Sequence, residues 1–237
     1  MADTLSRLVS QQIRRRFFLE QKIMESLTAP SFDRAFREQL GELFRFRRDV
    51  RRFRRDPVPL EMVEHLLELA NLAPSVGLSQ PWRFVIVDDP DRRAQVRANF
   101  ERCNAKALAS QTADRANDYS KLKLAGLDAP CHLAVFAEPE PQEGGGLGRQ
   151  TMPETIAYST VMAVHTLWLA ARAMELGVGW VSILDPEAVA RTLDVPLRWK
   201  FIGYLCLGYP ENVGQTPELE RRGWEFRRPV DCRIVRR

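Results

Sequence analysis

The sequence has few of the residues from which metal centres, disulfide frameworks and hydrolase triads are built. Four cysteines are spread over 237 residues without a CxxC pair, and three histidines lack HxxxH or HExxH spacing. Such spacing predicts reduced, buried thiols rather than disulfides, and it argues against a metal site. The absence of GxSxG removes support for a serine hydrolase. The four cysteines are Cys103, Cys131, Cys206 and Cys232, and the three histidines are His65, His132 and His165.

Long apolar segments are also scarce. Residues 1–30 contain no apolar core of a signal peptide. The most apolar stretch, 155–177, includes His165, Arg172 and Glu175, which makes it too polar for lipid. We therefore expect a soluble cytoplasmic protein without membrane contact, in which 155–177 is a core helix, with a subunit interface as the alternative. The glycine cluster in 139–150 lacks the third glycine of a dinucleotide fingerprint, because Arg149 stands there.

Positive charge is abundant but local. The formal net charge is +4, yet residues 44–56, FRFRRDVRRFRRD, contain seven arginines and two aspartates, so the rest of the chain is nearly neutral. A local excess indicates a site rather than a cationic coat for nucleic acid. RNA binding would need stacking platforms or a known module signature, and neither is present.

The hydrophobic pattern predicts an α+β or α/β protein with helices packed on a sheet, because strands alternate with helices. A hydrophobic fraction of 45% is enough for one main domain. Helices are expected at 5–28, 59–74, 91–128 and 155–177, with a turn and a helix in 30–43. Strands are expected at 83–90, 131–138, 177–184 and 199–210, and a loop at 139–150.

The arginine-rich segment is the first candidate site. Guanidinium groups bind phosphate oxygens with two hydrogen bonds, whereas lysine offers a point charge. We expect Arg47, Arg48 and Arg51 to converge on one phosphate. The alternative is a solvated charge run, but apolar residues between the arginines tie the segment to a packed surface; these are Phe44, Phe46, Val50 and Phe53.

Four motifs together resemble the flavin-binding nitroreductase fold, in order and spacing, from about residue 40 to 230. They are RRDVRRF (47–53), APSVGLSQPW (73–82), GVGWVSI (177–183) and LGYP (207–210). Asp49 stands where ordinary nitroreductases have serine, and Leu78 where they have asparagine.

These departures resemble one branch of the family, the 5,6-dimethylbenzimidazole synthases (BluB, flavin destructases). YSTVMAVHTLWLAARA (158–173), PELERRGW (217–224) and DYSKLKLAGL (118–127) resemble the same branch, and in that family the last segment forms a lid over the flavin.

The resemblance implies a homodimeric α+β protein with a mixed, mainly antiparallel sheet flanked by helices, and FMN at the subunit interface. Residues 41–237 would form the flavin-binding domain, and residues 1–40 a helical extension. The implied reaction consumes reduced FMN with O2 and without a metal. It yields 5,6-dimethylbenzimidazole, the lower ligand of vitamin B12, and erythrose 4-phosphate. A separate flavin reductase would supply the reduced FMN.

The resemblance also assigns residue roles. Arg47, Arg48 and Arg51, with Val50 between them, would hold the phosphate and ribityl chain. Ser75 and Gln80, on the second FMN loop, would be polar contacts to the flavin of the other subunit. The remaining contacts would be Arg115 and Leu124 on the lid, Ser182 near the flavin ring or ribityl chain, and Arg222 near the phosphate.

Asp49 is the main catalytic prediction, with Ser182 as a possible hydrogen-bond donor. A carboxylate beside a phosphate repels its ligand, so binding alone does not explain it. Ribityl C–C cleavage and ring rearrangement need proton transfers, which a positioned carboxylate can supply. The surrounding arginines favour the ionised form and a general base. The structural alternative is that Asp49 only organises the arginines by ion pairing.

Two other functions remain open at this point. One is an NAD(P)H-dependent FMN nitroreductase or dehalogenase, which would recycle its flavin. The other is a non-catalytic RNA- or flavin-binding protein that uses the basic segment, for which steep salt-dependent RNA binding without turnover would be the sign.

Overall fold

A computed structural model describes residues 30–108, 124–229, 234, 235 and 237 of the chain. The chain divides into two compact units, residues 1–41 and 42–237. The helix predicted at 5–28 lies outside the described residues. The assignment of residues 1–40 as a helical extension beside a flavin-binding domain stays a prediction.

The turn and helix predicted within 30–43 are confirmed by helix α2 (Arg34–Phe46). Asp33 precedes the helix, and its Oδ1 accepts a hydrogen bond of 2.8 Å from the backbone N–H of Phe36. An aspartate at this position satisfies a helix N–H that has no partner within the helix. The local sequence therefore explains where α2 begins.

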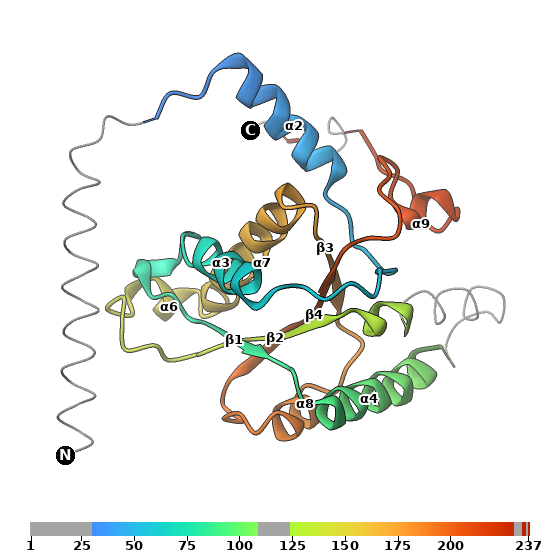
Figure 1. Ribbon diagram of the computed structural model, residues 1–237. Coiled ribbons are helices and arrows are strands. Elements are labelled where there is room, and N and C mark those ends of the chain that lie inside the picture. Colours follow the sequence, from blue (N-terminus) through green and yellow to red (C-terminus); the bar gives the residue numbers. More distant parts are fainter. Residues whose placement is uncertain (1–29, 109–123, 230–233, 236) are drawn as a thin grey trace. The chain divides into compact units, whose positions relative to one another are not determined.

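The second unit contains a four-stranded antiparallel sheet in the order β1-β2-β4-β3 (Figure 1). The strands are β1 (Trp82–Ile86), β2 (Cys131–Ala137), β3 (Gly177–Val181) and β4 (Lys200–Gly208), and all four were predicted. The expectation of a mainly antiparallel sheet is confirmed. A parallel element is limited to an isolated bridge between Asp49 and Val178 among the described pairings.

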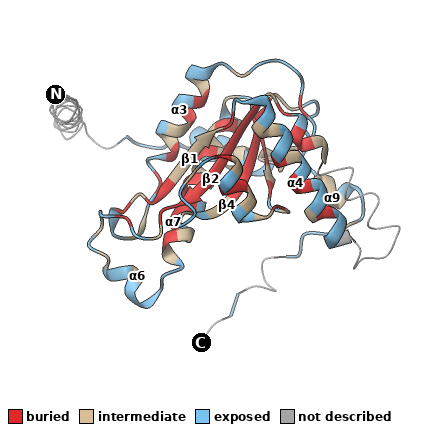
Figure 2. Cartoon of the chain, turned by 90° about the horizontal axis from the view of Figure 1, so that it is seen from below, coloured by how far each residue is buried: buried red, intermediate tan, exposed pale blue. Residues whose placement is uncertain are grey.

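Helices cover both faces of this sheet, as predicted. Helices α3 (Leu60–Ala70) and α7 (Thr155–Ala173) pack on one face, and α4 (Pro90–Leu108) and α8 (Pro186–Thr192) on the other (Figure 1). Alternate residues of a strand point to opposite faces. Every residue of β2 is therefore buried, which Figure 2 shows as a continuous red strand. Leu133 and Val135 join the first core, and Ala134 and Phe136 the second.

Helix α7 confirms the prediction of a core helix. Seven of its residues are buried at helical spacing: Ile156, Ser159, Thr160, Ala163, Val164, Leu167 and Ala171. Its other side exposes Tyr158, Val161 and Met162. In the described part of the chain, no helix is long and apolar enough to cross a membrane.

The sequence patterns missed three short helices. The predicted loop 139–150 is wrong at its end, where α6 (Leu147–Thr151) begins. Helix α8 follows Asp185, whose side chain accepts from the backbone N–H of Ala188, and Pro186 occupies its first turn. These are ordinary helix-start signals. The third is α9 (Glu218–Arg221).

The helix predicted over 91–128 is shorter than expected. Helix α4 ends at Leu108, residues 109–123 lie outside the described part, and a short 3-10 turn, η2, spans Ala125–Asp128.

Candidate functional site

A cleft of about 220 Å³ brings together two stretches of the second unit that are far apart in sequence. Residues 48–52 form one wall and residues 212–222 the other. Five arginines line the cleft together with two carboxylates, those of Asp49 and Glu218. Such a surplus of guanidinium groups suits an anion. The lining arginines are Arg48, Arg51, Arg52, Arg221 and Arg222.

The first wall is held against strand β3. The backbone N–H of Val50 donates to the carbonyl of Val178 at 3.0 Å. Gly179 permits this approach, because a Cβ there would lie 2.2 Å from the carbonyl oxygen of Val50. Gly177 likewise leaves room for the Val50 side chain. The glycines of GVGWVSI and the arginine segment are therefore parts of one packing arrangement.

Asp49 is the carboxylate of the first wall. Its Oδ1 accepts a hydrogen bond of 2.9 Å from the backbone N–H of Trp180, and its Oδ2 accepts from Nη2 of Arg51 at 2.9 Å. The carboxylate is 30% exposed, and it lines the cleft. One contact fixes the side chain to the sheet, and the other orients a guanidinium group.

Arg48 and Arg51 carry buried donors without partners among the described residues. They are Nε of Arg48 and both Nε and Nη1 of Arg51, whose side chain is 5% exposed. Leaving a buried charged donor unsatisfied is costly, so these atoms indicate a missing acceptor. Burial, followed by the charges of Arg227 and Arg47, lowers the pKa of Arg48. An anion in the cleft would relieve both the unpaired donors and this unfavourable charge.

Arg47 is directed elsewhere. Its guanidinium carbon lies 5.1 Å from the centre of the Trp168 ring, in a cation–π contact, and it does not line the cleft. Trp168 also donates from Nε1 to the carbonyl of Arg48 at 3.0 Å. The three predicted arginines thus separate in the structure: two line the cleft, and the third packs on the tryptophan that holds the segment.

The second wall was largely missed by sequence reasoning. Arg222 was predicted and lines the cleft, where its Nη2 lies 3.2 Å from Oε1 of Glu218. The motif 217–224 was the available signal, but a lone charged stretch does not reveal which side chains face a site. The missed lining residues include Arg52, Asn212, Gly214, Thr216, Glu218 and Arg221.

Ser75 and Gln80 lie on the predicted second loop but do not line this cleft. Ser75 Oγ accepts from the backbone N–H of Gln80 at 3.1 Å, and the Gln80 amide donates to Asn71 at 3.3 Å. Ser159 anchors the loop to α7, because its Oγ accepts from the backbone N–H of Val76 at 3.0 Å. Within one chain, these side chains therefore hold their own loop.

Two further predicted contacts, Ser182 and Leu124, do not line the cleft. Ser182 follows β3 and is exposed, and Leu124 packs against the core beside α4 and α8. Arg115, like most of the predicted lid, lies outside the described residues. The prediction for Arg115 therefore stays a prediction.

The histidines and cysteines that the structure describes form no alternative site. Among the described residues, His, Cys, Asp and Glu side chains make no group of three that could hold a metal. His132 is buried between the Tyr204 hydroxyl at 2.9 Å and the Ala129 carbonyl at 3.0 Å. Described cysteines are free thiols, and burial raises the pKa of Cys131 to about 11, which makes it a poor nucleophile.

Comparison with known proteins places the chain in a family. Residues 44–209 match the nitroreductase family. A 5,6-dimethylbenzimidazole synthase of Rhodospirillum rubrum is 58% identical over 211 residues, which is 89% of this chain and 99% of the relative. A second, from Rhodobacter capsulatus, is 48% identical over 85% of this chain and 98% of the relative.

A solved structure of iodotyrosine deiodinase bound to FMN and 3-iodo-L-tyrosine has a similar fold. Its TM-score is 0.66 at 28% identity, over 83% of this chain and 97% of the other.

Proposed function

This chain belongs to the nitroreductase family, and we propose that it is a 5,6-dimethylbenzimidazole synthase that fragments reduced FMN with O2. The observation that carries the proposal is the pairing of Asp49 with Arg51 beside buried, unpartnered guanidinium donors. The high identity to two synthases supports the choice of reaction. The products would be 5,6-dimethylbenzimidazole and erythrose 4-phosphate.

The FMN phosphate would occupy the arginine cleft. Nε of Arg48, and Nε and Nη1 of Arg51, are the donors that require an acceptor, and phosphate oxygens are suited to them. Arg222, on the opposite wall, would contact the same phosphate. Arg47 would act through Trp168, by holding the backbone of Arg48, rather than by direct contact.

Asp49 would perform the proton transfers. Its carboxylate is partly exposed to the cleft and is held by Trp180 and Arg51, so its position is defined before a ligand binds. A preorganised carboxylate can remove a proton from the ribityl chain when the phosphate is anchored beside it. FMN itself supplies the carbon skeleton that is cleaved, and it is a substrate rather than a resident cofactor.

A second subunit would complete the site. The cleft is smaller than the roughly 300–1,000 Å³ of pockets that enclose a whole ligand. Helix α7 exposes Tyr158, Val161 and Met162, an apolar surface suited to an isologous contact. In a homodimer, Ser75 and Gln80 would approach the flavin bound by the partner subunit. Ser182, Leu124 and Arg115 would contact the isoalloxazine ring of a flavin. We place this dimer in the cytoplasm, with a separate reductase supplying reduced FMN.

Product analysis after aerobic turnover tests the function. The protein is mixed with a molar excess of chemically reduced FMN in air, and the products are separated by chromatography and mass spectrometry. We expect 5,6-dimethylbenzimidazole and erythrose 4-phosphate in amounts that match the FMN lost. Intact FMN together with reduction of a nitroaromatic or a halogenated substrate by NAD(P)H would instead identify a flavin-recycling oxidoreductase.

A further inference from the structure

Glu218 is a carboxylate in a cleft otherwise suited to an anion. It belongs to α9, its side chain is 18% exposed, and it lines the same cleft as Arg48 and Arg51. Its Oε1 lies 3.2 Å from Nη2 and 3.3 Å from Nε of Arg222. Arg222 therefore has an internal anionic partner before any ligand arrives.

This arrangement weakens phosphate binding in two ways. A phosphate that approaches Arg222 must compete with the Glu218 carboxylate for the same guanidinium donors. The negative charge of Glu218 also lowers the positive potential in the cleft, and Coulomb interactions are strong where side chains are partly removed from water. A cleft selected only for tight phosphate retention would gain from a neutral side chain at this position.

We propose that Glu218 sets the phosphate affinity of the cleft, and keeps it low enough for a phosphorylated product to leave. The inference rests on the proposed function, because an enzyme that consumes FMN releases the phosphate on a sugar fragment in every turnover. A resident flavin would carry no such requirement. Glu218 acts through Arg222 and through its charge, and it is a positioning residue rather than a catalytic one.

Binding measurements with Glu218→Gln test the proposal without turnover. Glutamine keeps the size of the side chain and an acceptor for Arg222 but removes the charge. We expect the Kd values of oxidised FMN and of inorganic phosphate to fall by roughly three- to tenfold. FMN binding is followed by quenching of flavin fluorescence, and phosphate binding by competition with FMN.

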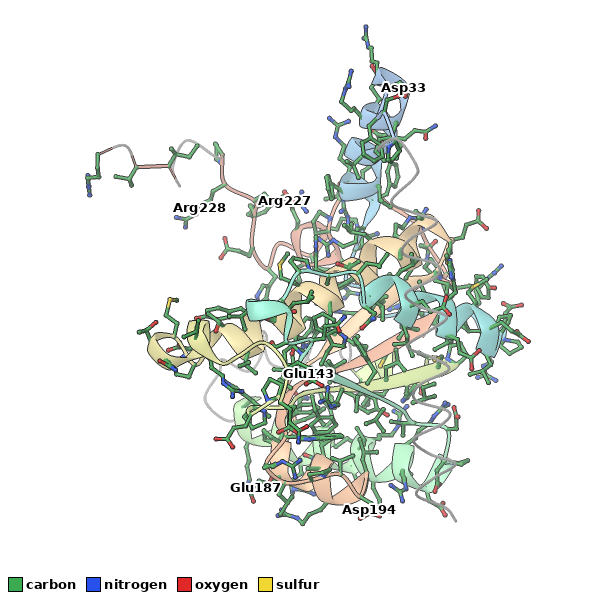
Figure 3. The ribbon with its side chains drawn as sticks, turned by 90° about the vertical axis from the view of Figure 1, so that its left-hand side faces the viewer. Asp33, Glu143, Glu187, Asp194, Arg227 and Arg228 are labelled. Carbon is green, nitrogen blue, oxygen red and sulfur yellow. The ribbon has the colours of Figure 1, made fainter. Side chains whose placement is uncertain are left out.

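Glu187→Gln is the matched control. Glu187 pairs with Arg191 at the same i,i+4 spacing and the same 3.2 Å distance, but on α8, with its side chain 78% exposed. In Figure 3, Glu187 and Arg227 lie at opposite ends of the second unit, and the charge of Arg227 acts on Arg48 of the cleft. We expect this variant to bind both ligands like the parent. Glu218→Asp, which restores the charge, should return the Kd values towards those of the parent.

A readout during turnover separates this role from a merely structural one. In Glu218→Gln, the KM for reduced FMN should fall, and inhibition by erythrose 4-phosphate should strengthen by the same factor as the binding. Unchanged or weaker binding of FMN and phosphate by folded Glu218→Gln, and by Glu218→Ala as a second variant, would overturn the inference. A parent protein that binds neither ligand would instead overturn the proposed function.

Discussion

Arg51 and Asp49 form an ion pair in which Nη2 lies 2.9 Å from Oδ2, and the other donors of the buried guanidinium, Nε and Nη1, have no partner among the described residues. Arg51 therefore donates one hydrogen bond to Asp49 and keeps two donors for a ligand. Asp49 is in turn fixed by the backbone N–H of Trp180. This relationship joins the proposed phosphate-binding group and the proposed catalytic carboxylate, so substitutions of the two residues test different functions.

Asp49→Asn should retain FMN binding and lose product formation. Removing the negative charge of Asp49 should strengthen binding of the FMN phosphate. The amide NH2 group, however, takes the place of the oxygen that accepts from Arg51, which should weaken the position of Arg51 and oppose the first effect. We expect the Kd of FMN to change by less than about fivefold, and the yield of 5,6-dimethylbenzimidazole to fall by about 100-fold or more. The Kd is measured by fluorescence and the product by chromatography.

Asp49→Ser provides a second variant of the same prediction, because serine stands at this position in ordinary nitroreductases. Product formation that simply follows FMN occupancy in both variants would remove Asp49 from the chemistry and leave it as an organiser of the arginines.

Arg48→Ala and Arg51→Ala should weaken FMN binding. Each removes charge-assisted hydrogen bonds to the phosphate, which are worth about 1.5–3 kcal/mol, so the Kd should rise by roughly 10- to 100-fold. Riboflavin, which lacks the phosphate, should bind the variants and the parent with similar affinity. Arg191→Ala, at an exposed position of α8, is the control. Parent-like FMN affinity in both cleft variants would contradict the assigned phosphate site.

Gly179→Ala should displace the arginine segment from β3. The added Cβ would lie 2.2 Å from the carbonyl oxygen of Val50, so backbone must move. We expect a loss of about 1–3 kcal/mol in the free energy of unfolding, measured by denaturant titration, together with weaker FMN binding. Gly41→Ala, on α2, is the control, because outside its own helix a Cβ there would meet no atom within 4 Å. Unchanged stability and affinity would show that the contact is not needed.

The buried His132 should make the folding stability of the protein sensitive to acid. The Ala129 carbonyl can only accept, so Nε2 donates to it and Nδ1 accepts from the Tyr204 hydroxyl. Burial, followed by the charge of Arg93, lowers the pKa of His132 to about 4, against an ordinary value of 6.5. Between these values the unfolded chain binds a proton that the folded chain does not. Stability should therefore decrease as the pH falls from about 6.5 to 4, by about 3 kcal/mol in total.

Denaturant titrations across this pH range measure the effect. His132→Asn should be less stable at pH 7 but should show a shallower dependence on pH, whereas His65→Gln, at an exposed position, should behave like the parent. An equally steep dependence in His132→Asn would assign the acid sensitivity to other groups.

Local patterns in the sequence were sufficient for most of the fold. The four strands and helices α3 and α7 were predicted because apolar residues recur with the spacing of buried elements, and prolines and glycines mark their ends. The arginine segment was predicted to be a site because charged and apolar residues alternate within it. Helix α8 was missed although Asp185 and Pro186 signal its start, since a seven-residue helix offers too little periodicity to be noticed.

The amino-acid sequence by itself was sufficient to predict an anion site at a guanidinium-rich segment with a central aspartate, because guanidinium groups bind anions in any fold. Only the tertiary structure decided which arginines face the cleft. Arg48 and Arg51 line it, and Arg47 packs on Trp168. The segment has one register against β3, because Val50 N–H bonds to the Val178 carbonyl and Gly179 has no side chain that would block the approach. The second wall, with Glu218 and Arg222, is brought there by chain folding across more than 160 residues, a proximity that no local pattern contains.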